Sequence, residues 1–243
     1  MTFSKESTVN TATTPRALQI LTVITIILFV IALGLVFFYA PREATMGEVQ
    51  RIFYFHVPSA WVGGLAFLVT LVAGVGFLRT GDYKWDRVGL SSVEIGITFS
   101  IMTLFSGMLW ARPSWNTWWT WDPRLTTFTI VLLLYFAYLM LRQGIEDPGR
   151  RARFASVYGI VAFISVPITY FAIQLARSIH PVIFGSANPN AEGDSSLTPE
   201  MLHTFFFCLF TFTVLYVTLL WHRVRLASYA ERVEQLKAKA LAA

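Results

Sequence analysis

Residues 17–40 read ALQILTVITIILFVIALGLVFFYA, an apolar run without a charged side chain. A helix needs about 20 mostly apolar residues to cross a bilayer, so this run predicts a membrane-spanning helix. It is too long for a signal-peptide core and has no small-residue cleavage site, which indicates a retained anchor. Five similar runs lie at residues 59–78, 91–111, 125–142, 154–176 and 202–222. We therefore expect an all-α, polytopic membrane protein, built as a bundle of six transmembrane helices.

The composition agrees with a membrane protein and excludes several other classes. Of the 243 residues, 55% are hydrophobic and 14% are charged, whereas a soluble domain carries about 25% charged residues. The 19 basic residues exceed the 14 acidic ones but form no long basic block, which argues against a nucleic-acid partner. The single cysteine, Cys208, excludes an internal disulfide and a CxxC pair.

The basic residues separate into two groups when the six runs are placed across a membrane. Fourteen of the 19 fall in the terminal segments and in the connections near residues 79–90 and 142–153. The other five lie in the connections on the opposite side; they are Arg42, Arg51, Arg112, Arg124 and Arg177. Because Lys and Arg concentrate in cytoplasmic loops, we expect both termini in the cytoplasm and the connections 41–58, 112–124 and 177–201 outside.

Three segments make up the expected domain organisation. Residues 1–16 are rich in Ser and Thr and are expected to be a disordered cytoplasmic N-terminus. Residues 17–222 form the six-helix membrane domain. Residues 223–243 place Leu226, Val233, Leu236 and other apolar residues at helical spacing among charged ones. This pattern predicts an amphipathic cytoplasmic helix that lies on the membrane surface or on a neighbouring protein.

Tryptophan is concentrated in the second outward connection, at residues 110–125. Five of the eight tryptophans lie there: Trp110, Trp115, Trp118, Trp119 and Trp121. One interpretation is an aromatic belt at the membrane–water interface, where Trp is enriched. The other is a flat apolar platform with N–H donors at its edge, suited to a large planar ligand. The residues alone leave both interpretations open.

Two of the four histidines are expected at the same outer level as these tryptophans. His56 ends the first outward connection and His180 follows the fifth span. A single interfacial histidine is usually a structural hydrogen-bonding residue, but two imidazoles from different helices can hold haem iron from both faces. His203 is expected either to support a ligand histidine or to be a spare ligand, and His222 lies at the cytoplasmic end and is expected to be structural. Arg112 and Arg124 bracket the tryptophans and can pair with ligand carboxylates.

Several catalytic motifs do not occur in the chain. The sequence contains no GxxxxGK[ST] phosphate loop and no HExxH, GxSxG or CxxCH motif. Any ATP dependence must therefore come from a partner, and a protease, a hydrolase and a covalent c-type haem carrier all lack their signatures.

Two motifs resemble a known family. Residues 118–122, WWTWD, resemble the WWD signature of the haem-handling proteins of cytochrome c biogenesis. Residues 51–61, RIFYFHVPSAW, are similar to the segment before span two in the cytochrome c maturation protein C (CcmC, haem exporter protein C) family. The resemblance extends over residues 17–222. It implies a six-helix bundle whose outer connections bind haem.

The resemblance also implies roles for individual residues and for partners. His56 and His180 would be the axial ligands of the haem iron. The other cofactor-binding residues would be Trp115, Trp118, Trp119, Trp121, Asp122 and Arg124. The haem would be delivered, at the outer face of the cytoplasmic membrane, to a CcmE-like haem chaperone anchored in the membrane. An ABC-type complex with CcmA-, CcmB- and CcmD-like subunits would assist.

Two alternatives to haem delivery remain. The chain could conduct haem or another apolar solute across the bilayer as the transport subunit of an ABC-type complex. Such a path requires polar or ionisable residues along several spans, and beyond Glu94 the spans contain few. A structural assembly subunit, whose tryptophans only anchor the connections, would bind no haem.

Overall fold

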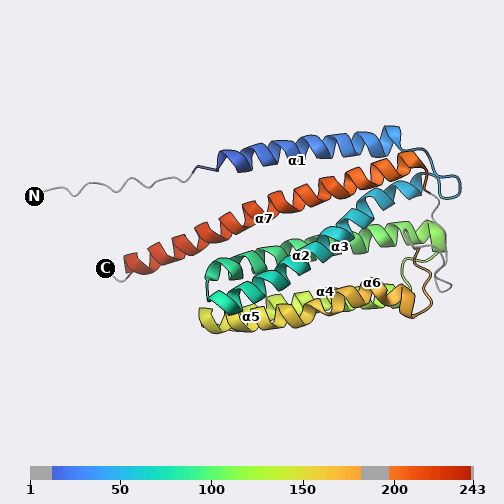
Figure 1. The fold of residues 1–243 in the computed structure, drawn as a ribbon. Coiled ribbons are helices and arrows are strands. Elements are labelled where there is room, and N and C mark those ends of the chain that lie inside the picture. The colour runs from blue at the N-terminus through green and yellow to red at the C-terminus, as the bar shows by residue number, and fades with distance from the viewer. Residues whose placement is uncertain (1–12, 182–196, 242–243) are drawn as a thin grey trace, which may run out of the picture.

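The computed structural model describes residues 13–181 and 197–241, and every regular element in these ranges is helical (Figure 1). Residues 1–12, where disorder is expected from the sequence, lie outside the described residues. The elements in chain order are α1 (Arg16–Gly34), the π-helix η1 (Leu35–Tyr39), the 3-10 helix η2 (Glu48–Ile52), α2 (Phe53–Thr80), α3 (Tyr83–Trp115), α4 (Pro123–Gln143), α5 (Pro148–Phe163), α6 (Ser165–Leu175) and α7 (Pro199–Leu241).

Six helical segments are long and apolar enough to cross a membrane, which confirms the predicted all-α fold and number of spans. They are Arg16–Tyr39, Glu48–Thr80, Tyr83–Trp115, Pro123–Gln143, Pro148–Ile173 and Pro199–Leu241. Several helices continue past the ends of the apolar runs, because local capping rather than hydrophobicity sets where a helix stops. The chain is therefore a multi-pass membrane protein.

Aspartates begin three of these helices. The side chains of Asp82, Asp122 and Asp147 each accept a hydrogen bond from a backbone N–H in the first turn of α3, α4 and α5. Such N-caps satisfy donors that have no partner within the helix. Between α2 and α3, Gly81 takes a left-handed conformation with φ of 67°, which allows the tight turn.

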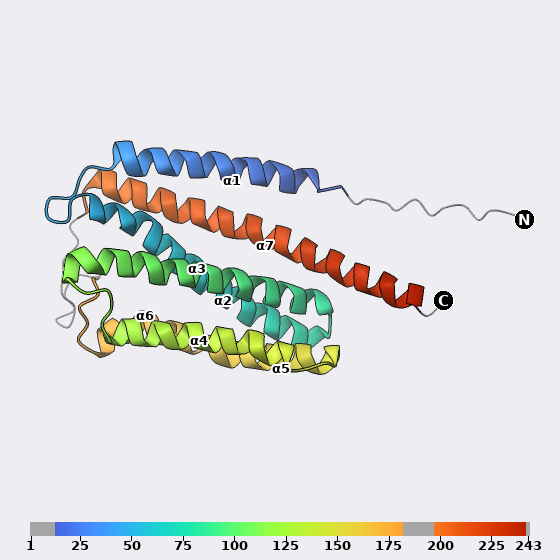
Figure 2. The same cartoon turned by 180° about the vertical axis from the view of Figure 1, so that it is seen from behind.

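The bundle has α2 and α3 at its centre (Figures 1 and 2). On one side α7 and α1 cover them, and on the other side α4 and the α5–α6 segment do. Three buried clusters fill these sides, and one of them joins α2 and α3 to α7 through Phe99 and Phe212. The other two lie on opposite sides of the central pair. One includes Phe67 stacked on Tyr135 with ring centroids 3.5 Å apart, and the other includes Tyr54 and Phe205.

The fifth span is broken between Phe163 and Ser165. Pro167 lies shortly after the break, and its missing N–H leaves the carbonyl four residues earlier without its helical partner. That carbonyl belongs to Phe163, the last residue of α5. The Ser165 hydroxyl donates to the nearby carbonyl of Ala162 over 2.6 Å, which satisfies an acceptor at the break.

Three connections lie at one end of the bundle, as Figure 1 shows. We name this the loop end; it comprises residues 40–47, 116–122 and 176–181. The short turns at 81–82 and 144–147 lie at the opposite end. The tryptophan connection is shorter than the predicted loop 110–125. Helix α3 continues to Trp115 and ends at Asn116, whose left-handed φ of 55° stops the helix.

Helix α7 continues without a break from the sixth span into the tail, as far as Leu241. Figure 1 shows this part of α7 extending beyond the bundle. The Arg87 side chain on α3 donates to Glu231 over 2.9 Å and ties the first part of the tail to the bundle. Residues 223–241 therefore form a helix, and apolar Leu226, Val233 and Leu236 are exposed on it.

Candidate functional site

The structure brings His56 and His180 together at the loop end. His56 lies in the first turn of α2, and His180 lies in the segment that follows α6. The centroids of the two imidazole rings are 6.4 Å apart, and the ring planes differ by 33°. Two segments that are distant in sequence thus bring two imidazoles to one place.

Helix α3 holds the ring of His56 from one side. Nδ1 of His56 lies 3.0 Å from Oγ of Ser106. The Ser106 hydroxyl has one proton, and it points to the carbonyls of Met102 and Thr103, at 2.7 and 3.2 Å. The hydroxyl oxygen therefore accepts from His56, which places the imidazole proton on Nδ1 and leaves the Nε2 lone pair available for a metal.

The ring of His180 has the same tautomer for a different reason. Its Nδ1 lies 3.0 Å from the carbonyl oxygen of Pro181. A carbonyl can only accept, so Nδ1 carries the proton and Nε2 carries the lone pair. Burial, together with the positive charge of Arg124 and the proximity of His56, lowers the pKa of His180 to about 3. The His180 imidazole is therefore neutral at physiological pH, as metal ligation requires.

The spacing of the two rings fits a metal held between them. With metal–nitrogen bonds of about 2.0–2.1 Å, two imidazoles on opposite sides of one metal have centroids about 6.4 Å apart. In residues 13–181 and 197–241, no three His, Cys, Asp or Glu side chains gather into a metal site. A metal that brings its own equatorial ligands, as haem iron does, needs only these two protein nitrogens.

The tryptophans divide between α3 and the connection after it. Trp110 and Trp115 are helical and pack edge to face, with centroids 5.0 Å apart. Trp110 follows Gly107, the neighbour of His56, by three residues and therefore lies on the same face of α3. In the connection, Trp119 and Trp121 also pack edge to face, and Trp118 and Trp121 are 51% and 75% exposed. The loop end thus carries broad exposed aromatic faces.

The arginines of the loop end differ in whether a protein group already pairs with the guanidinium. Arg112 donates to the backbone and side-chain oxygens of Asn116, and Arg51 pairs with Glu48 and with the carbonyl of Val36. Arg124 lies over the ring of Tyr170 with its guanidinium carbon 5.6 Å from the centroid. Among the described residues Arg124 forms no ion pair, so its charge is available to a ligand carboxylate beside the two imidazoles.

Asp122 is buried, and its carboxylate faces the protein. Its oxygens accept from the backbone N–H of Arg124, from the Ser178 hydroxyl and from the backbone N–H of Ile179, each over 2.9 Å. The sequence motif does place Asp122 beside the site, but these contacts link it to the segment of His180. The Asp-Pro pair indicates an N-cap, whereas nothing in the sequence indicates the bond to Ser178.

Sequence reasoning missed the residues that surround the histidines. Ser106 and Gly107 contact the ring of His56, and the hydroxyl of Ser178 accepts from the backbone N–H of His180. The only signal for the first pair is two small residues in the middle of an apolar run. Such residues also mark ordinary close contacts between membrane helices.

The other histidines and Glu94 lie outside this pair. His203 on α7 contacts the hydroxyl of Tyr39, at 3.3 Å, and His222 contacts Thr22 at 2.9 Å in the α1–α7 interface. Glu94 pairs with Arg223 on α7 at 2.6 Å. These contacts join helices to one another, and none of them involves His56 or His180.

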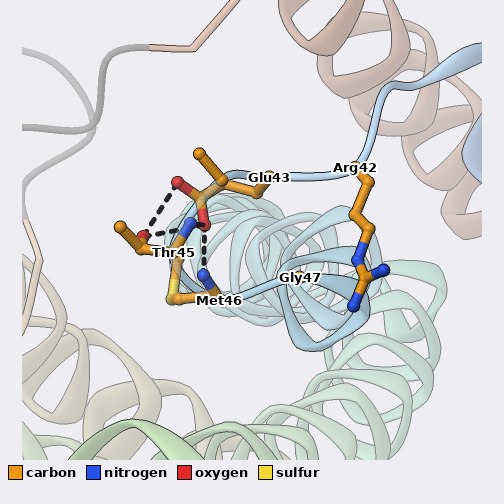
Figure 3. A pocket seen from close by; sticks show the side chains of 6 residues that line it. Arg42, Glu43, Thr45, Met46 and Gly47 are labelled. Atoms are coloured by element: carbon orange, nitrogen blue, oxygen red, sulfur yellow. Dashed lines mark hydrogen bonds between the residues drawn. The ribbon is translucent and has the colours of Figure 1, made fainter.

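A small hollow lies in the connection between α1 and α2, lined by residues 42–47. Figure 3 shows the carboxylate of Glu43 turned toward Thr45 and Met46, and Arg42 placed apart from them. Glu43 accepts hydrogen bonds from the backbone N–H groups of both residues. The carboxylate therefore closes its own turn, and the hollow offers a ligand no unpaired acid. Met46 also contacts Ser114 at the end of α3, with 3.9 Å between sulfur and hydroxyl oxygen.

Comparison with known proteins assigns the chain to a family. The family model described as "Heme exporter protein C" (CcmC) matches residues 2–239. "Heme exporter protein C" of Bradyrhizobium diazoefficiens is 33% identical over 227 residues, which cover 93% of this chain and 84% of that protein. The proteins of the same name from Rhodobacter capsulatus and Haemophilus influenzae are 28% and 30% identical. These matches cover 83% and 84% of this chain and 82% and 81% of the respective relatives. The chain therefore belongs to the heme exporter protein C (CcmC) family.

Proposed function

We propose that this protein binds haem between His56 and His180 and delivers it for the maturation of c-type cytochromes. The observation that carries the proposal is the arrangement of the two imidazoles, 6.4 Å apart with their described hydrogen bonds made at Nδ1. The relatives are named as haem exporters, which supports a haem as the group that such a pair would hold. The protein is a binding and delivery subunit and not an enzyme.

Each part of the loop end has a distinct task in this function. The Nε2 atoms of His56 and His180 bind the iron from its two faces. The exposed rings of Trp118 and Trp121 cover the porphyrin and exclude water. Trp119 packs against Trp121, and Trp115 packs against Trp110. The charge of Arg124 pairs with a haem propionate.

Delivery requires that one edge of the bound haem remain accessible. The exposure of Trp118 and Trp121 supports an open side, at which a membrane-anchored chaperone of the CcmE type can take the haem. The chain has no phosphate-loop motif. Energy for release therefore comes from the CcmA-like ATPase of an ABC-type complex that also contains CcmB- and CcmD-like subunits.

The distribution of positive charge sets the proposed orientation. Fourteen of the 19 basic residues belong, by the sequence, to the terminal segments and to the two connections opposite the loop end that holds His56 and His180. By the positive-inside rule, the loop end faces outward from the cytoplasmic membrane and both termini lie in the cytoplasm. Haem is then held on the side where c-type cytochromes mature.

The test is haem retention by purified variants. Replacement of His56 or His180 by Ala should lower haem occupancy and abolish the low-spin absorption spectrum of iron with two histidine ligands. His203→Ala and His222→Ala are matched controls, since these histidines contact Tyr39 and Thr22 instead. Full occupancy with an unchanged spectrum in both His56→Ala and His180→Ala would show that the ligand assignment is wrong.

A further inference from the structure

The carboxylate of Asp122 joins two connections of the loop end. As the N-cap of α4, it accepts from the backbone N–H of Arg124. It also accepts from the hydroxyl of Ser178 and from the backbone N–H of Ile179, across 56 and 57 residues of chain. The start of α4 and the segment that carries His180 are therefore held by one side chain.

These bonds extend to His180 through Ser178. The Ser178 hydroxyl donates its proton to Asp122, and its oxygen accepts from the backbone N–H of His180 over 3.1 Å. Asp122 thus fixes the residue before His180 directly and His180 itself through one intermediate. Asp122 and Ser178 are only 8% and 1% exposed, so water cannot readily replace either partner.

We propose that Asp122 is a positioning residue: it holds the backbone at His180 so that the imidazole meets the haem iron opposite His56. The proposal rests on the proposed role of His180 as an axial ligand. It assigns Asp122 to the support of that ligand, rather than to contact with haem itself. The tryptophan motif and His180 are therefore structurally coupled, because Asp122, the last residue of the motif, positions His180.

Asp122 makes hydrogen bonds that Asp147, another aspartate N-cap in this chain, does not make. Asp147 also precedes a proline, and it caps α5 by accepting from the backbone N–H of Arg150 over 2.7 Å. The backbone carbonyls of both aspartates accept from a residue four positions later, over 2.9 Å. The described hydrogen bonds of the Asp147 side chain remain within the start of its own helix. Asp147→Asn is therefore a control for the loss of a capping carboxylate alone.

The substitution Asp122→Asn keeps the size of the side chain and one oxygen for the cap. The oxygen that caps α4 is also the one that accepts from Ser178, so the amide nitrogen takes the place of the other oxygen. That nitrogen is a donor, and it faces the backbone N–H of Ile179, which is also a donor. Ser178→Ala removes the link to His180 and leaves the cap of α4 intact. Together the two variants separate the positioning of His180 from the stability of α4.

The first measurement is the spectrum of haem-loaded protein. We expect Asp122→Asn and Ser178→Ala to convert most of the low-spin haem to a five-coordinate high-spin form that retains His56. Added imidazole should restore the low-spin spectrum by occupying the position of His180. Asp147→Asn should resemble the unmodified protein. Low-spin spectra in both Asp122→Asn and Ser178→Ala, equal to that of Asp147→Asn, would overturn the proposal.

The second measurement uses haem-free protein, so it does not depend on ligation. Hydrogen exchange at the amide of Ile179 should become at least about tenfold faster in Asp122→Asn, because the protecting carboxylate oxygen is lost. Unchanged exchange would overturn the proposal. His180→Ala distinguishes a failure of the ligand assignment from a failure of the positioning role of Asp122. If His180→Ala keeps the low-spin spectrum, the proposed ligand is wrong; if it loses that spectrum while Asp122→Asn and Ser178→Ala keep it, only the positioning role is wrong.

Discussion

The ring of His56 occupies the space that a side chain at Gly107 would fill. A Cβ atom at Gly107 would lie 2.9 Å from Cε1 of His56, closer than the two atoms can approach without a shift. The approach of α2 to α3 at the loop end therefore depends on a glycine. This contact, together with the bond to Ser106, sets where the first of the two imidazoles lies.

Gly107→Ala should displace His56 and weaken haem binding about tenfold, which corresponds to about 1.4 kcal/mol. Alanine favours a helix by about 1 kcal/mol relative to glycine, so a loss of helix stability cannot cause the effect. Titration of haem into the purified variant measures it. Gly34→Ala in α1 is the control, because no atom lies within 4 Å of a Cβ at that position. Equal affinity in the two variants would contradict the packing argument.

Trp121→Ala should speed the loss of haem without unfolding the protein. The Trp121 side chain is 75% exposed, so its removal opens no cavity. An aromatic contact is worth about 0.5–1.5 kcal/mol, which predicts haem dissociation about two- to thirteenfold faster. Transfer to an apo-globin reports this rate. Trp61→Ala is the control, since Trp61 is 43% exposed and donates to Thr213 on α7. Equal rates of haem dissociation from Trp121→Ala and Trp61→Ala would favour the interpretation of the tryptophans as an aromatic belt.

Ligation by His180 should be insensitive to mild acid. A protonated imidazole cannot bind a metal, and a lowered pKa moves this competition to lower pH. With the pKa of His180 at about 3, proton competition at this ligand is absent between about pH 7.5 and about pH 5. The amplitude of the low-spin spectrum that depends on His180 should stay level in this range. A loss of that amplitude with a midpoint near the usual histidine value of about 6.5 would contradict the buried environment of His180.

Asp86→Ala should destabilise the bundle and leave the haem site unchanged. Asp86 and Arg142 form a two-point ion pair with side chains only 14% and 9% exposed. Removal of one partner leaves a buried charge, at a cost of about 3 kcal/mol. Denaturation in detergent measures the loss, and the haem spectrum is the control. The double variant Asp86→Leu/Arg142→Met should recover much of the stability; failure to recover it would show that the charge is not the cause.

The sequence was sufficient to predict the spans but not the contacts of the site. Hydrophobic runs located all six membrane helices, because a bilayer requires them to be long and apolar. The motif residues His56, Trp118 and Asp122 drew attention to the loop end. Their supports were not predictable, because Ser106 and Gly107 are unremarkable in an apolar helix and the bond from Ser178 to Asp122 depends on tertiary structure.

The start of the tryptophan connection could not be predicted from the sequence either. An apolar run that ends near residue 111 predicts a loop from there, yet α3 continues through Pro113 to Trp115. The helix ends where Asn116 adopts a left-handed conformation and accepts from Arg112, a local event that hydropathy does not record. Capping chemistry therefore decides which tryptophans are helical and which belong to the connection.

The most direct test of the central claim is an experimental structure of the haem-loaded protein, solved at a resolution that places both imidazoles. We expect Nε2 of His56 and Nε2 of His180 on opposite faces of one porphyrin, each about 2.0–2.1 Å from the iron. The Nδ1 atoms should still lie within hydrogen-bond distance of Oγ of Ser106 and of the carbonyl oxygen of Pro181, respectively. An iron bound by any other side chain, or by only one of the two histidines, would contradict the account.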